Sequence, residues 1–179
     1  MSEIEFVPPI LTITDEDALR GLRHAVSVKG PDHVYTPPVA GHTACVYVWE
    51  LDGQLSPQCI VGFALHHLGV PLELMHATGC NDINIGGLAG RLLKHGYVFQ
   101  ESSIDILRAA QVVQDWAMRV LDFCTCDVCR QQDATWGAAL AAAEELAAAR
   151  ANERAAQRAA GAQPTQPPAE EPPTESAGS

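Results

Sequence analysis

The sequence predicts a mainly α-helical protein with one small β-hairpin, an α+β chain built as a single compact domain. Apolar residues recur at helical spacing along most of the chain, an Asp-Gly pair follows a run of β-forming residues, and an alanine-rich stretch precedes a proline-rich end. These features divide the 179 residues into a flexible N-terminal segment (1–13), a helical domain (14–140), an alanine-rich helix (141–160) and a disordered tail (161–179).

The first helix has clear start and stop signals. Thr14 precedes three acidic residues, which is typical of an N-cap with acids in the first turn. Leu19, Leu22 and Val26 then lie on one helical face, and Gly30-Pro31 ends the helix.

A hairpin should follow near residues 45–58. The β-forming run 45–51 leads into Asp52-Gly53, a strong turn signal. The return strand should be short, because Ser56-Pro57 resembles an N-cap followed by proline at the first helical position. Cys45 and Cys59 flank the hairpin, and we expect them to be reduced and packed as small core residues.

Four more helices are expected before the alanine-rich stretch. Three short ones each end at a glycine, and they cover residues 57–68, 71–78 and 85–95. Ser102, with Asp105 three residues later, predicts the start of a longer helix. This helix is apolar on more than one face and should therefore be central. Trp49 and Trp136 are expected to be core or near-core anchors.

The C-terminal region changes composition. Alanine makes up 13 of the 23 residues from 138 to 160, and alanine has the highest helix propensity. Arg150, Arg154 and Arg158 lie four apart on this helix, either as a docking face for an acidic partner or as a solvated face. The tail after residue 160 has five prolines and no large apolar side chain, so it cannot form a packed core.

Net charge limits the classes of partner. The chain has 22 acidic and 11 basic residues, and residues 1–140 alone have 16 and 8. Such a surface repels phosphate backbones and anionic membranes, so we expect no membrane partner and weak nucleic-acid binding. The segment around Gly69-Val70-Pro71 resembles a helix-turn-helix, but residues 61–90 contain no Lys or Arg to contact phosphates. A DNA binder of this kind stays an alternative.

The sequence also predicts a compartment. No basic residue precedes Arg20, so the N-terminus lacks the charged start of a secretory signal. Apolar stretches are shorter than the roughly 20 residues that span a bilayer. We therefore expect a cytoplasmic protein whose six cysteines stay reduced.

Three cysteines form the sharpest local motif. Cys124, Cys126 and Cys129 could bind Zn²⁺ as thiolates, with His95 or Cys80 as a fourth ligand. A zinc-stabilised module is therefore one hypothesis. The alternative is a cysteine-bearing loop between helices with no metal, because the segment has only one C-x-x-C pair and no histidine follows it.

Motifs of common enzymes are missing from the sequence. It contains no phosphate-binding P-loop, no G-x-S-x-G and no H-E-x-x-H, and no cofactor is implied beyond a possible zinc ion. His66 and His67 are adjacent on a helix and so point about 100° apart, which disfavours a shared metal. An unrecognised enzyme stays an alternative, which a deep polar pocket gathering His33, His66 or Asp115 would favour.

Several segments resemble a family of small uncharacterised proteins from actinobacteria and their phages. The most specific are Cys59-Ile60-Val61-Gly62 and Leu68-Gly69-Val70-Pro71-Leu72. The others are residues 19–23, 30–35, 45–47, 53, 64–65, 110–115 and 136–139. The resemblance spans most of residues 18–140, and the segment from Asp115 to Gln132, with the cysteine cluster, looks like an insertion. It implies no established activity and transfers no catalytic residue.

Protein–protein contact is the function that these observations favour. The chain is compact, lacks a catalytic motif, and carries an alanine-rich helix with an acidic tail. We therefore expect a small phage or actinobacterial accessory protein that binds a protein partner, in the host cytoplasm if a phage encodes it.

Overall fold

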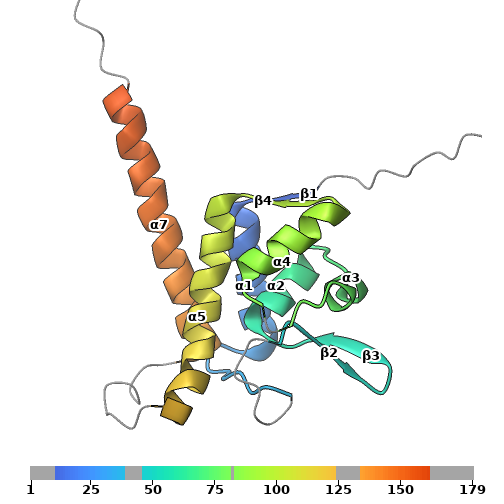
Figure 1. Cartoon of the computed structure of the whole chain (residues 1–179). Helices are drawn as coiled ribbons and strands as arrows, with labels where there is room; N and C mark the ends of the chain where they lie inside the picture. The colour runs from blue at the N-terminus through green and yellow to red at the C-terminus, as the bar shows by residue number, and fades with distance from the viewer. Residues whose placement is uncertain (1–10, 39–45, 82, 124–133, 162–179) are drawn as a thin grey trace, which may run out of the picture.

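A computed structural model describes residues 11–38, 46–81, 83–123 and 134–161. This part of the chain is mostly helical, with two small two-stranded sheets, which confirms the predicted fold class (Figure 1). The helices are α1 (Asp15–Lys29), α2 (Ile60–His67), α3 (Leu72–Ala77), α4 (Ile85–Leu92), the 3₁₀ helix η1 (Leu93–His95), α5 (Glu101–Phe123) and α7 (Trp136–Gly161). The strands are β1 (Leu11–Ile13), β2 (Val48–Leu51), β3 (Gln54–Pro57) and β4 (Tyr97–Phe99).

Helix α1 begins with the predicted cap. The Thr14 hydroxyl accepts from the backbone N–H of Asp17, and the Asp17 carboxylate accepts from the Thr14 backbone N–H at 3.0 Å. These bonds form a capping box and lower the pKa of Asp17, with the backbone bond from Thr14 as the largest cause. The helix ends at Gly30, as predicted.

The hairpin is confirmed, but its return strand is longer than expected. Asp52 and Gly53 both have positive φ (52° and 76°), which a two-residue type I′ turn requires. Ser56 and Pro57 pair with β2 and so do not start a helix, which corrects the N-cap prediction. Pro57 is tolerated because it stands at the strand end. Cys59 is the N-cap of α2 instead, and its sulfur accepts from the Gly62 N–H.

A second sheet was not predicted. Strand β1 pairs in parallel with β4, and Ile13 is 1% exposed, so residues 11–13 are ordered rather than part of a flexible segment. Burial of Ile13 and backbone bonds to Gly96 and Gln100 hold this strand in place. Each strand leads directly into a helix, so α1 and α5 begin at the same edge of the sheet (Figure 1). Residues 1–10 lie outside the described part.

Helix α5 is central, as predicted, and packs against α1, α2, α4 and α7. Two of its glutamines cap other helices. Gln111 accepts from the backbone N–H of Ile85 in α4, and Gln114 accepts from that of Ile60 in α2 at 2.7 Å. Both glutamines are buried, so these bonds satisfy amides that helix ends leave without partners.

The predicted start of α5 is wrong in detail. The helix begins at Glu101, one residue before Ser102. The Ser102 hydroxyl donates to Asp15 of α1, and Asp105 binds two arginines, so neither makes the expected capping bond. Contacts with other helices override the local capping pattern here.

The core lies between α1, α2, α5 and the first half of α7, and it extends to α3 and α4, which contribute Met75, Ile85, Leu88 and Leu92. Trp136 is fully buried, which confirms the prediction of a core anchor. Trp49 on β2 is half-buried and is not among the side chains packed against the core, so the same prediction is wrong for Trp49. Helices α1 and α2 approach closely where Gly21 meets Ala64. No helix within the described residues is long and apolar enough to cross a membrane.

Helix α7 runs without a break through the expected boundary between residues 140 and 141. Its start is fixed to the loop after α1, since the backbone N–H groups of Trp136 and Gly137 donate to the carbonyls of His33 and Pro31. Residues 162–179, predicted to be a disordered tail, lie outside the described part.

Candidate functional site

The two halves of α7 differ in burial. Trp136, Ala139 and Ala143 are fully buried against the core, whereas every residue from 151 to 160 is exposed. Figure 1 shows that this end of the helix runs past α5 and away from the other elements. We call residues 151–160 the projecting half of α7. At 1.5 Å per residue it is about 15 Å long.

A groove lies between α1 and α7 where the projecting half begins. Its volume is about 370 Å³. Its apolar lining is Leu19, Ala147, Ala148 and Ala151, and its charged lining is Asp15, Glu16, Arg23, Glu144 and Arg154. A surface of this kind, apolar in the middle and charged at the rim, suits contact with a helix or side chain of a protein partner.

Two ion pairs join α1 to α7 at the rim of the groove. Arg23 donates to Glu144 through Nε at 2.9 Å and Nη2 at 2.7 Å, and both bonds go to Oε1. Arg154 pairs with Asp15 at 3.1 Å. These pairs are half-exposed, so each contributes at most about 1 kcal/mol to stability. They set the orientation of α7 on α1.

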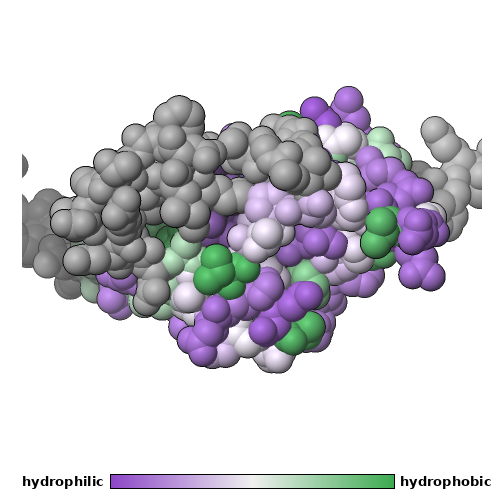
Figure 2. Space-filling model, turned by 90° about the horizontal axis from the view of Figure 1, so that it is seen from below, coloured by the Kyte–Doolittle hydropathy of each residue, from purple (hydrophilic) through white to green (hydrophobic). Residues whose placement is uncertain are grey.

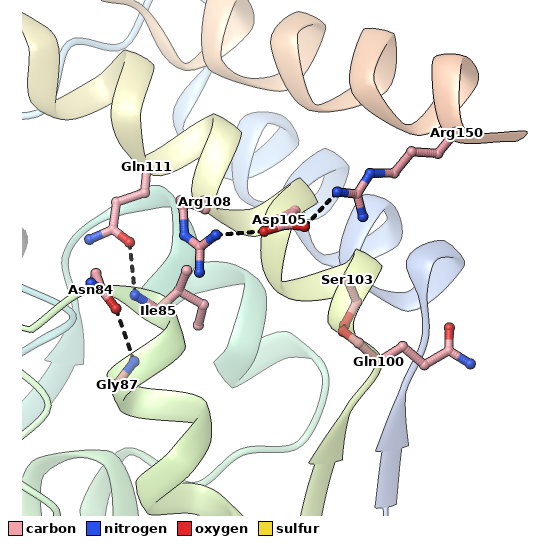
Figure 3. Close-up of polar contacts among 9 residues, drawn as sticks. All are labelled: Asn84, Ile85, Gly87, Gln100, Ser103, Asp105, Arg108, Gln111 and Arg150. Carbon is pink, nitrogen blue, oxygen red and sulfur yellow. Dashed lines mark hydrogen bonds and ion pairs between the residues drawn. The ribbon is translucent and has the colours of Figure 1, made fainter. Parts of the chain in front are cut away.

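A third contact joins α7 to α5. Asp105 accepts from Arg150 of α7 and from Arg108 of its own helix, each at 2.5 Å (Figure 3). Figure 3 also shows Gln111 pointing to the backbone of Ile85, so α5 binds α7 on one side and α4 on the other. The polar residues of α5 thus fix the base from which α7 projects.

The three arginines that lie four residues apart on α7 therefore differ in their partners. Arg150 and Arg154 pair within the chain, whereas Arg158 makes no ion pair among the described residues. Arg158 lines an open depression of about 310 Å³ together with Arg154 and Gln157. Of these three arginines, Arg158 is the one whose charge is available for an external partner.

Histidines lie in two separate places. His24 of α1 stacks on His67 of α2 with ring centroids 3.8 Å apart. Burial lowers the pKa of His67, and the neighbouring His24, Arg20 and His66 lower it further. Parallel stacked rings do not direct their nitrogens at one ion, so this pair does not suit a metal.

The residues of the enzyme hypothesis are not gathered in these pockets. His33 packs edge-on against Trp136, 4.6 Å between centroids, and burial followed by the charge of Lys29 lowers its pKa. His66 is exposed on α2, and Asp115 lies on α5 beside Gln114. Neither of the two grooves described above is lined by His33, His66 or Asp115.

The zinc hypothesis rests on residues that the structure does not describe. Cys124, Cys126 and Cys129 lie outside the described part, so zinc binding there stays a prediction. Within residues 11–38, 46–81, 83–123 and 134–161, no three His, Cys, Asp or Glu side chains form a group that could hold a metal. The proposed fourth ligand Cys80 is buried, and burial raises the pKa of its thiol to about 11.

Exposed apolar side chains are scattered over the described surface. They are Leu11, Val28, Val34, Leu51, Leu93 and Val112. From below, hydrophobic residues form separate green areas between purple ones (Figure 2). Single exposed apolar residues are normal on a protein surface, so they indicate no contact site of their own.

No known protein family has a model that matches this chain, and comparisons with curated proteins and with solved structures give no match either.

The groove could not be found from the sequence. Arg23 and Glu144 are 121 residues apart, and Asp105 and Arg150 are 45 apart. The only sequence signal was the spacing of the three arginines, which identified the right helix but not which of them is paired.

Proposed function

We propose that this chain acts by binding another protein chain through the projecting half of α7. The observation that carries this proposal is the run of ten consecutive exposed residues, 151–160, on a helix whose first half buries one face against the core. The end of a helix opens more readily than its packed part, so residues 151–160 would gain stability when a partner covers them.

Charge supports a partner that carries carboxylates. Arg158 has no ion pair within the described residues, and the residues from 151 to 160 include two arginines and one glutamate. The rest of the chain is acidic, so this end differs in charge from the body. Opposite charges on a partner would guide it to this end and set its orientation.

The biological setting is part of the same proposal. The resemblance to small proteins of actinobacteria and their phages supports an accessory role in the cytoplasm of such a cell. An extract of an actinobacterium is therefore the medium for the test.

Site-specific photo-crosslinking tests the proposed contact surface. A photoreactive amino acid replaces Ala155 in one variant and Glu73, which is exposed on α3, in a matched control. We expect protein adducts from position 155 and few from position 73. Equal labelling from both positions, or none from 155, would contradict the proposal.

A further inference from the structure

Two imidazoles meet where α1 and α2 approach closely. A Cβ on Gly21 would lie 2.9 Å from the carbonyl oxygen of Ala64, so the two helices are in contact there. His24 and His67 each follow three residues later on their helices, and their rings stack with centroids 3.8 Å apart and planes 12° apart. The ring of His67 is exposed and that of His24 is half-buried, so the pair lies at the surface.

Two further basic residues extend this pair. Arg20 lies four residues before His24 and therefore on the same face of α1, and 61% of its side chain is exposed. His66 precedes His67 on α2 and is exposed. Burial lowers the pKa of His67 most, and the charges of His24, Arg20 and His66 lower it further, so the four groups lie within electrostatic reach of one another. We call these four residues the α1–α2 basic cluster.

Little negative charge compensates the α1–α2 basic cluster, although the chain has a net charge of −11. Arg20 pairs with Asp17 through Nη2 at 2.6 Å. Among the described residues, the three histidines of the cluster make no ion pair, and no carboxylate is among the causes that shift the pKa of His67. Lys29, whose ammonium lies 5.1 Å from the centre of the Phe63 ring, adds a further positive charge one turn along both helices.

We propose that the α1–α2 basic cluster binds a phosphate group, either as the free ion or at the end of a phosphate monoester. The site lies on α1 and α2, so it goes beyond the proposed protein contact on α7 and does not depend on it. A phosphate monoester carries a charge of about −1.5 to −2 near neutral pH and three strong acceptor oxygens. Such a group supplies the negative charge that the cluster lacks.

The stacked rings suit an anion rather than a metal ion. A metal ion requires ring lone pairs that converge on one point about 2 Å away, which parallel rings do not provide. Parallel imidazoles can instead each donate an N–H to a different oxygen of one anion. Arg20 adds a third donor, because its ion pair with Asp17 uses Nη2 and leaves the other N–H groups without a partner among the described residues. Three donors match the three oxygens of a phosphate group, whereas a carboxylate has two.

Binding of the anion should be coupled to protonation of the rings. The lowered pKa of His67 keeps this ring mostly neutral near pH 7. A bound phosphate group favours the charged imidazolium, so it should raise the pKa of His67. By the reciprocity of linked equilibria, protonated rings should bind the anion more tightly than neutral rings do.

Proton NMR of the histidine ring signals, recorded on the full chain from about pH 5.5 to 8.5, measures the pKa of His67 with and without ligand. Inorganic phosphate or glycerol phosphate, each at roughly 20 mM, replaces chloride at constant ionic strength, and acetate is the carboxylate control. We expect phosphate to raise the pKa of His67 with millimolar affinity and acetate to change it little. A rise with inorganic phosphate alone identifies the free ion as the ligand, and a rise with glycerol phosphate identifies a monoester. No rise with either compound, or an equal rise with acetate, would overturn the proposal.

Substitutions test which residues hold the anion. Arg20→Gln should weaken phosphate binding about tenfold, because a charge-assisted donor is lost. Arg108→Gln is the matched control, since this arginine is also exposed but lies on α5 beside Gly86 of α4. Circular dichroism checks that both variants keep the helices. Equal weakening by the two substitutions would show attraction by overall charge and would overturn the site. None of these measurements involves α7, so their failure would leave the proposed function untouched.

Discussion

Trp136 is the largest fully buried side chain, and it contacts the rings of His33 and Phe63 from two other parts of the chain. Its indole N–H is buried without a hydrogen-bond partner, so its contribution comes from packing rather than from polar bonding. Since its backbone also fixes the start of α7, this residue couples the projecting helix to the core.

Trp136→Ala should lower the free energy of unfolding by about 3–5 kcal/mol, because it leaves a large cavity. Urea denaturation measures the loss. Trp49→Ala is the comparison, and it should cost less because Trp49 is half-buried. A loss of under about 1 kcal/mol for Trp136→Ala would contradict a core position.

Two helical glycines should respond oppositely to alanine. A Cβ on Gly62 would overlap the carbonyl oxygen of Tyr47, whereas one on Gly90 meets no atom within 4 Å. Gly62→Ala should therefore destabilise the protein by about 1–3 kcal/mol, and Gly90→Ala should stabilise it by about 0.5–1 kcal/mol. Thermal unfolding compares the two variants, and equal shifts would be inconsistent with this packing.

At the scale of elements, α1 is joined to α2 by close backbone approach and by the stacked His24 and His67. It is joined to α7 by ion pairs. The lowered pKa of His67 means that protonation of this ring works against the contact between α1 and α2.

Stability should fall when the pH drops through about 6.5, the ordinary value for histidine. His67 and His33 have lowered pKa values in the folded protein, so the unfolded chain binds protons first and is favoured. His67→Gln should reduce this loss, measured as the change in free energy of unfolding between about pH 7.5 and 5. His95→Gln, on the exposed η1 helix, is the control, and equal pH dependence in the two variants would refute the role of His67.

The bond between α5 and α7 can be measured by a double-mutant cycle. Asp105→Ala and Arg150→Ala each remove one partner, and the coupling energy between them should be about 0.2–1 kcal/mol because the pair is partly exposed. The same cycle with Arg158→Ala in place of Arg150→Ala should give no coupling. A coupling of zero in the first cycle would mean that the ion pair does not hold α7.

Local sequence signals predicted the elements well, because caps and turns act within a few residues. Thr14, Asp52-Gly53 and Gly96 mark boundaries that the structure confirms. Strands β1 and β4 were missed, since three residues are too short to show a period and their partners are 86 residues apart. The roles of Ser102, Asp105 and Gln114 likewise depend on other helices, which local spacing does not encode.

At the scale of the whole molecule, a compact acidic body carries a helix that leaves it (Figure 1). The core needs only the first half of α7, and the ion pairs to α1 and α5 hold that half in place. The second half makes one ion pair to α1, from Arg154 to Asp15, and its residues are otherwise exposed, which is why the proposal places its role in binding.

Hydrogen exchange along α7 tests that role most directly, measured by mass spectrometry on the full chain with and without actinobacterial extract. The account predicts slow exchange of residues 136–147 in both samples, and exchange of residues 151–160 that is fast for the chain alone and slower with the extract. Fast exchange of residues 151–160 in both samples would show that no partner covers the projecting half of α7.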